Sequence, residues 1–271
     1  MNDHFGVVAD PSFRTSPPEL LKLAGLHYFY FTHLTGHQAQ YGLSGEKSAG
    51  GLRIQLPDGG AAYWSLLERR DQKFARDTER RERKAIQELG PLRFMFDDGA
   101  GLTTLLAEKR KQYLRTGKGD WLGMPGRTAL LQQLATSRAS ECRGVLSSLW
   151  FGETWAATHF GLMSERTLHY WLPVYNAELS TLAPGRLLLR NVILNAGAAG
   201  IKAIDRGMGE TQAKNDFPSE RQIFSSGAWH RPGVRSLSYR AYQSAKWRFG
   251  EPLARILTRA QRGSEPRRTS S

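Results

Sequence analysis

The order of predicted elements in one stretch of the chain constrains the fold most strongly. Residues 143–152, 154–164 and 167–176 have the apolar alternation and aromatic content of strands, and only short turns separate them. A helix pattern over 184–200 and a short apolar strand over 201–207 follow. Three consecutive strands and then a strand–helix–strand unit predict a mixed sheet with helices on both faces.

Weaker patterns on either side of this stretch divide the chain into parts. The charged segment 61–89 has few apolar residues after Leu67, which is typical of a helix that flanks or bridges domains. We therefore expect an N-terminal part over 1–90, a main domain over 91–235, and C-terminal helices with a basic tail over 236–271. The other predicted elements are helices over 17–25, 101–117, 127–139 and within 237–263, strands over 26–34, 52–56 and 92–98, and a loop over 37–51.

The composition narrows the setting and the partners. The 271 residues are 40% hydrophobic, enough for a core, and contain a single cysteine, so no disulfide can form within the chain. No apolar run approaches the roughly 20 residues of a membrane span, and no secretory signal pattern is found, so we expect a cytoplasmic protein. The net charge of +13 favours phosphate-bearing ligands, nucleic acid or anionic surfaces. No CxxC or HExxH spacing occurs, and we expect no metal site.

The predicted hairpin of 154–164 and 167–176 gathers histidines and aromatic residues on one face. A three-residue turn beginning at Ser164 would place His159 opposite Trp171, whereas a two-residue turn would reverse the faces of one strand. The face away from the core would line a cleft or form a second, aromatic-rich core. That face would carry His159, Gly161, His169, Trp171 and Tyr175, and the core face Phe160, Leu162, Leu168, Tyr170, Leu172 and Val174.

The start of the helix predicted over 184–200 is a candidate anion site. Free backbone N–H groups and the positive end of the helix dipole gather there. Pro184 has no N–H group and presets the helix start, Gly185 lets a phosphate approach closely, and Arg186 adds charge. An ordinary proline-led helix start is the alternative.

Asp205 ends the strand that leaves the predicted strand–helix–strand unit. In parallel sheets, ligands bind outside the carboxyl ends of the strands. Lys214 follows on the next predicted helix and adds a positive charge near that edge. A structural role for Asp205, capping the loop or the helix start, is the alternative.

The sequence resembles the CelD-type acetyltransferases of cellulose and exopolysaccharide biosynthesis. That family has the GNAT acyltransferase fold and is related to the FemABX peptidyltransferases. The resemblance implies an α/β (α+β) fold whose mixed, mostly antiparallel sheet is flanked by helices and preceded by a partial GNAT-like N-terminal half. The matching stretches are 74–94, 105–117, 157–162 (ATHFGL), 168–176 (LHYWLPVYN), 182–193 (LAPGRLLLRNVI) and 205–217 (DRGMGETQAKNDF).

The resemblance also implies the reaction. An acyl group would pass from acetyl-CoA or another acyl-CoA directly to an amine or hydroxyl of a polysaccharide or cell-envelope precursor, with both substrates bound. The donor arm would lie along the strand that holds His169 and Trp171, with its pyrophosphate near Pro184, Gly185 and Arg186. A backbone N–H group of that strand would polarise the thioester carbonyl.

Three catalytic roles follow from the resemblance. His159 would act as the general base on the acceptor, while Asp205 and Lys214 would orient the acceptor or bind phosphate. The family commonly has tyrosine where this chain has Ala213, so either the chain lacks the acid that protonates the leaving thiolate or Tyr175 takes that role. Two alternatives stay open: an aminoacyltransferase that uses charged tRNA, which the net charge of +13 favours, or a degenerate GNAT fold that only binds a partner.

Overall fold

The chain folds into two compact units. In the computed structural model the larger unit is residues 49–223, and the smaller unit combines residues 1–48 with residues 224–271. These units divide the chain between residues 48 and 49 and between residues 223 and 224. The domain boundaries expected near residues 90 and 235 stay a prediction. The structure describes residues 4–139, 141–209, 215–217, 220–234 and 236–239.

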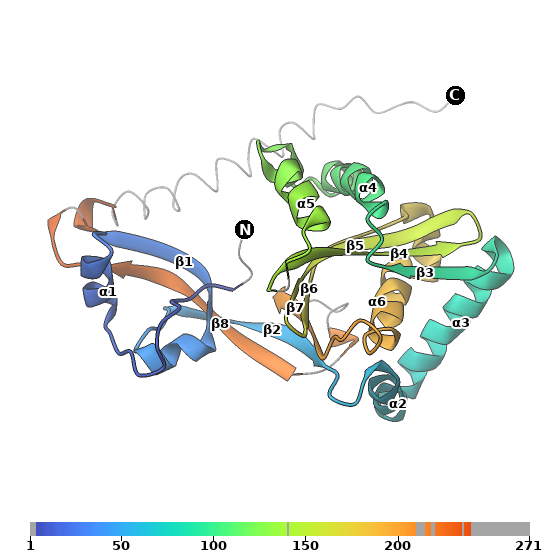
Figure 1. Cartoon of the computed structure of the whole chain (residues 1–271), viewed down its shortest axis with the longest axis horizontal. Helices are drawn as coiled ribbons and strands as arrows, with labels where there is room; N and C mark the ends of the chain where they lie inside the picture. The colour runs from blue at the N-terminus through green and yellow to red at the C-terminus, as the bar shows by residue number, and fades with distance from the viewer. Residues whose placement is uncertain (1–3, 140, 210–214, 218–219, 235, 240–271) are drawn as a thin grey trace, which may run out of the picture. The chain divides into compact units, whose positions relative to one another are not determined.

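A mixed sheet forms the centre of the larger unit (Figure 1). Neighbouring strands are antiparallel except for β6 and β7, which run parallel. The predicted mixed, mostly antiparallel sheet is therefore confirmed. In spatial order the strands are β2 (Lys47–Gln55), β7 (Ala203–Met208), β6 (Thr167–Tyr175), β5 (Thr154–Ser164), β4 (Arg143–Phe151) and β3 (Leu92–Phe96).

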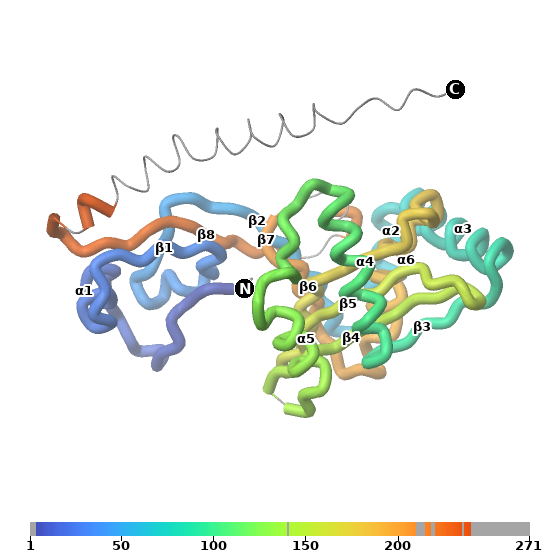
Figure 2. The backbone as a smooth tube through the Cα atoms, turned by 90° about the horizontal axis from the view of Figure 1, so that it is seen from above, coloured from blue at the N-terminus to red at the C-terminus, as the bar shows by residue number. Residues whose placement is uncertain are grey.

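Helices cover both faces of this sheet, as predicted. On one face, α4 (Gly101–Thr116) and α5 (Arg127–Thr136) pack over the strands through one apolar cluster (Figure 2). On the other, α2 (Gly60–Arg70), α3 (Gln72–Leu89) and α6 (Pro184–Leu194) share a larger apolar cluster with the sheet. Short 3-10 turns lie at Trp121–Gly123 and Ala177–Leu182. In the described part of the chain, no helix combines the length and the apolar character needed to cross a membrane.

The single helix predicted over 61–89 is two helices. The backbone of Asp71 leaves the helical conformation, with φ −140° and ψ 75°, between α2 and α3. Its carboxylate accepts a hydrogen bond from the Phe74 N–H group at 3.0 Å and so caps α3. The break lets α2 and α3 follow different directions while both stay on the apolar cluster below the sheet.

The smaller unit is built from both ends of the chain. Strand β1 (Tyr28–Thr35) pairs antiparallel with β8 (Glu220–His230), and α1 (Pro17–Leu23) and a 3-10 turn at Gly36–Tyr41 complete it. Phe31 and Trp229 are almost fully buried, with ring centroids 4.5 Å apart. The predictions missed β8, and β2 begins inside the predicted loop over 37–51. The helices expected within 237–263 fall almost entirely outside the described residues.

Candidate functional site

The two parallel strands β6 and β7 pair only over their first residues. Thr167 lies beside Ala203, Leu168 beside Ile204 and His169 beside Asp205, and among the described residues their pairing ends there. The strands continue past this point, β6 to Tyr175 and β7 to Met208, so they part within the sheet.

A β-bulge in β6 follows directly after the point of parting. Phe160 of β5 pairs with Leu172 and Gly161 pairs with Tyr170, which leaves Trp171 as the extra residue. The extra residue reverses the alternation of side chains. As a result Tyr170 lines the same pocket as Pro173 and Tyr175, whereas Leu172 packs on the opposite face.

The hairpin register differs from the predicted one. Ser164 pairs with Thr167, so the turn has two residues instead of the expected three. The turn shifts the partner of His159 from Trp171 to Leu172, and the bulge shifts it by one more residue, to Pro173. Leu168 and Tyr170 pack in another apolar cluster than the other residues of the predicted core face. The alternation pattern does not reveal turn length or bulges, and both errors follow from that.

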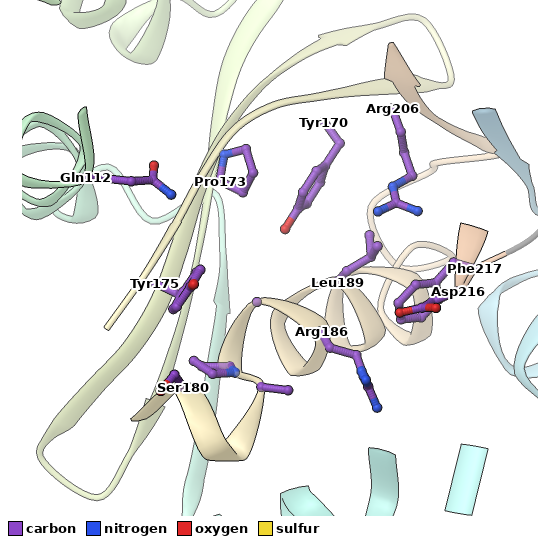
Figure 3. A pocket seen from close by; sticks show the side chains of 13 residues that line it. Gln112, Tyr170, Pro173, Tyr175, Ser180, Arg186, Leu189, Arg206, Asp216 and Phe217 are labelled. Atoms are coloured by element: carbon purple, nitrogen blue, oxygen red, sulfur yellow. The ribbon is translucent and has the colours of Figure 1, made fainter. Parts of the chain in front are cut away.

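A pocket of about 400 Å³ occupies the space where the strands part (Figure 3). Residues of β6 form one wall, and the first turns of α6 and the end of β7 form the others. Four residues predicted for the site meet there: Tyr175, Pro184, Gly185 and Arg186. The remaining lining residues are Gln112, Tyr170, Pro173, Ser180, Ala183, Leu189, Arg206, Asp216 and Phe217.

The start of α6 is shaped for a close approach. Ala183 precedes the helix in the left-handed conformation, with φ 53° and ψ 52°, and Pro184 is the first helical residue. A methyl group added at Gly185 would meet only the Tyr175 ring, at 3.7 Å, among the described atoms. The space above Gly185 therefore belongs to the pocket.

Both positively and negatively charged side chains line the pocket, and the positive ones are more numerous. Arg206, Arg186 and Asp216 line it. Arg186 donates a hydrogen bond to the Asp77 carboxylate at 3.0 Å and lies over the Phe74 ring at 4.6 Å, so its charge is shared with α3. Burial lowers the pKa of Arg206, whose guanidinium lies over the Phe217 ring at 5.7 Å.

A match to a sequence profile identifies the family of the chain. Residues 72–215, more than half of the chain, match the sequence profile of the Acetyltransferase (GNAT) domain. The chain belongs to this GNAT family. It therefore has a GNAT-type acyltransferase domain, whose matched residues include β6, its bulge, α6 and β7.

Three solved structures resemble the GNAT chain at low sequence identity. A conserved protein of unknown function from Bacteroides thetaiotaomicron is 12% identical with a TM-score of 0.46, covering 76% of this chain and 64% of its own. FemX is 9% identical with a TM-score of 0.48, covering 78% and 67%. The C-terminal domain (DUF2156) of a putative lysylphosphatidylglycerol synthetase from Agrobacterium fabrum is 12% identical with a TM-score of 0.45, covering 84% and 75%. No curated protein sequence matches the chain.

His159, the predicted base, lies beneath the pocket wall of the GNAT domain. Its side chain is fully buried and stacks on the Tyr170 ring, with centroids 4.2 Å apart and planes 10° apart. Burial lowers the pKa of His159 to about 3, and neither ring nitrogen has a hydrogen-bond partner among the described residues. The ring does not line the pocket, so its predicted contact with an acceptor is not present in this structure.

Asp205, His169 and Trp171 do not line the pocket. Asp205 is 3% exposed and accepts a hydrogen bond from the Gly207 N–H group at 2.7 Å, as the structural alternative for it required. His169 lies beside Asp205 where the strands part. Trp171 packs edge-on against Trp121 at 5.7 Å on the α4 and α5 face. Lys214 lies outside the described residues.

Several lining residues escaped the sequence predictions, and one signal could have found them. Pro173 sits inside a strand flanked by two others, although proline has no N–H group for a sheet and is confined to edges and bulges. Its position marks the segment of β6 that has lost a neighbour. Tyr170 and Arg206 follow the paired residues His169 and Asp205 on each strand, so both enter the gap.

Proposed function

We propose that the GNAT domain transfers an acyl group from acyl-CoA to an amine or hydroxyl, with the pocket between β6 and β7 holding the donor arm. One observation carries the proposal. The strands part immediately after the His169–Asp205 pair, and the pocket that fills the gap reaches the start of α6 at Gly185. An extended arm with a phosphate at one end fits such a slot.

The helix start supplies the phosphate end of the proposed site. Backbone N–H groups at the first turn of α6 and the positive end of its dipole favour an anion. Gly185 leaves room for it, and Arg186 lies beside it with part of its charge committed to Asp77.

The β-bulge supports the chemical step of the proposal. A bulge leaves backbone groups without partners in the ladder, and an N–H group there can donate to the thioester oxygen as negative charge develops. The acceptor nitrogen or oxygen attacks the carbonyl carbon, the C–S bond breaks, and the leaving thiolate sulfur takes a proton from an acid, which is restored by the proton that the acceptor loses. We assign that proton to Tyr175, which lines the pocket and is 37% exposed.

The acceptor and its activation belong to the same proposal. The CelD-type resemblance favours a glycan or cell-envelope precursor in the cytoplasm as acceptor, with no metal involved. The roles expected for His159, Asp205, His169 and Trp171 require movement, because these residues do not line the pocket. The role expected for Lys214 in binding the acceptor or phosphate stays a prediction.

A second candidate donor is charged tRNA. The net charge of +13 favours it, because a basic surface neutralises phosphates. The acyl carbonyl would then be an ester, and the phosphates would lie largely outside the pocket.

Thermal stability in the presence of each donor tests the proposal. Acetyl-CoA at 100 times its dissociation constant should stabilise the fold by about 2.7 kcal/mol. Gly185→Leu should abolish this shift by filling the pocket, while Gly185→Ala serves as the matched control. Stabilisation by charged tRNA, together with no response to acetyl-CoA or longer acyl-CoAs, would contradict the proposal.

A further inference from the structure

The Tyr170 hydroxyl is a polar group of the pocket that no described residue satisfies. The hydroxyl oxygen is buried and has no hydrogen-bond partner among the described residues, while the side chain lines the pocket. Leaving a buried hydroxyl without a partner costs about 1–3 kcal/mol. A buried polar group in this condition calls for an explanation, and a bound ligand is one.

The packing of the Tyr170 ring fixes the direction of its hydroxyl. The Tyr170 ring stacks on the buried His159 ring at 4.2 Å, and Tyr170 is the last residue before the bulge at Trp171. Figure 3 shows the hydroxyl pointing into the pocket between Pro173 and Leu189. A donor held this rigidly is organised before a ligand arrives, so binding has little ordering to do there.

The environment selects what the hydroxyl can bind. Burial raises the pKa of Tyr170, so the phenol stays protonated and offers an O–H donor. Of the lining residues, Pro173 and Leu189 are apolar, the positive charge of Arg206 acts on the hydroxyl, and Figure 3 shows the Asp216 carboxylate well away from the hydroxyl. The phenol O–H and the Arg206 guanidinium both favour an oxygen atom that accepts hydrogen bonds, and a carbonyl oxygen is such an acceptor.

We propose that the Tyr170 hydroxyl donates a hydrogen bond to an amide carbonyl oxygen in the arm of the acyl donor. Tyr170 is then a binding residue that recognises the arm itself, separately from the phosphates at Gly185 and from the acyl group. This assignment rests on the proposed use of acyl-CoA as donor.

Calorimetric titration of wild type and Tyr170→Phe with three probes tests the assignment. The probes are CoA, acetyl-CoA, and adenosine 3′,5′-bisphosphate, which lacks the arm. The phenylalanine variant keeps the stack on His159 and loses only the hydroxyl. Its dissociation constants for CoA and acetyl-CoA should rise about tenfold, the loss of one hydrogen bond, with the nucleotide affinity unchanged. Tyr30→Phe, an exposed tyrosine of the smaller unit, is the matched control and should change nothing.

The outcomes separate this assignment from the proposed function. Unchanged affinity of Tyr170→Phe for CoA and acetyl-CoA, or a loss of turnover alone, overturns the assignment and leaves the acyl-CoA proposal standing. No binding of any probe by wild type overturns both. The melting temperature gives a second check, because removing an unpartnered hydroxyl should leave it equal or higher. A fall of several degrees in Tyr170→Phe would show a structural partner and would overturn the assignment.

Discussion

His159 illustrates, at the scale of single residues, how burial decides what a side chain can do. Histidine is the residue type most suited to proton transfer near neutral pH. Full burial against Tyr170 instead keeps the ring neutral, with its pKa lowered to about 3. The buried His159 ring therefore affects mainly the stability of the fold and the position of Tyr170.

His159→Phe should weaken the dependence of stability on acid. The folded pKa, about 3, lies below the ordinary 6.5, so as the pH falls below 6.5 the unfolded chain takes up a proton that the folded chain refuses. Stability is then lost through this window, by about 2 kcal/mol between pH 7 and pH 5. Urea unfolding at both pH values should show that difference shrinking in the variant. An equal loss in variant and wild type would contradict the burial of a neutral ring.

Gly60→Ala should destabilise the fold, because a methyl group there would lie 1.7 Å from the Ile193 carbonyl oxygen. Backbone cannot yield as a flexible side chain can, so we expect a loss above about 2 kcal/mol. At Gly185 an added methyl group would lie 3.7 Å from its nearest neighbour, the Tyr175 ring. The free energy of unfolding of Gly185→Ala should therefore stay within about 0.5 kcal/mol of wild type or be higher. Chemical denaturation of the two variants checks this contrast, and equal effects would refute the close approach of α2 to α6.

The contact between α3 and α6 explains, at the scale of elements, how a highly charged helix joins the larger unit. Arg190 of α6 donates to both carboxylate oxygens of Glu82, at 2.9 and 3.1 Å, and lies over the Trp64 ring at 4.6 Å. The side chains of Arg190 and Glu82 are only 13% and 17% exposed. Charged side chains of α3 and α6 therefore hold these two helices together.

Arg190→Met should cost about 3 kcal/mol, because it leaves the Glu82 carboxylate buried without its partner. Adding Glu82→Gln to it should restore part of the loss. Lys84→Met removes an exposed pair with Glu88 and should change stability by less than about 0.5 kcal/mol. Urea midpoints of the variants provide the test; similar values for Arg190→Met and Lys84→Met would show that the pair does not dock α3.

Strand patterns in the sequence could predict most elements of the larger unit, but not their register. The order from β3 to β7 and the helix start at Pro184 follow from local patterns and short turns. The bulge at Trp171 does not, because it depends on how β5 and β6 pair. The same limit applies to β8, whose partner β1 lies almost 200 residues away in sequence.

The smaller unit matters at the scale of the whole molecule, because it uses both ends of the chain. Phe224 and Trp229 of β8 are 1% and 6% exposed within it. A chain starting at residue 47 should expose both residues, bind an apolar dye and aggregate. The same shortened chain with Phe224→Ser and Trp229→Ser should bind less dye. A soluble, monomeric shortened chain without dye binding would contradict the pairing of β1 with β8.

A crystal structure of the whole chain with CoA tests the central claim most directly. We predict the arm in the gap between β6 and β7, with the pyrophosphate at Gly185 and an amide oxygen within hydrogen-bond distance of the Tyr170 hydroxyl. CoA bound elsewhere, with no part of it in the gap past the His169–Asp205 pair, would contradict the account.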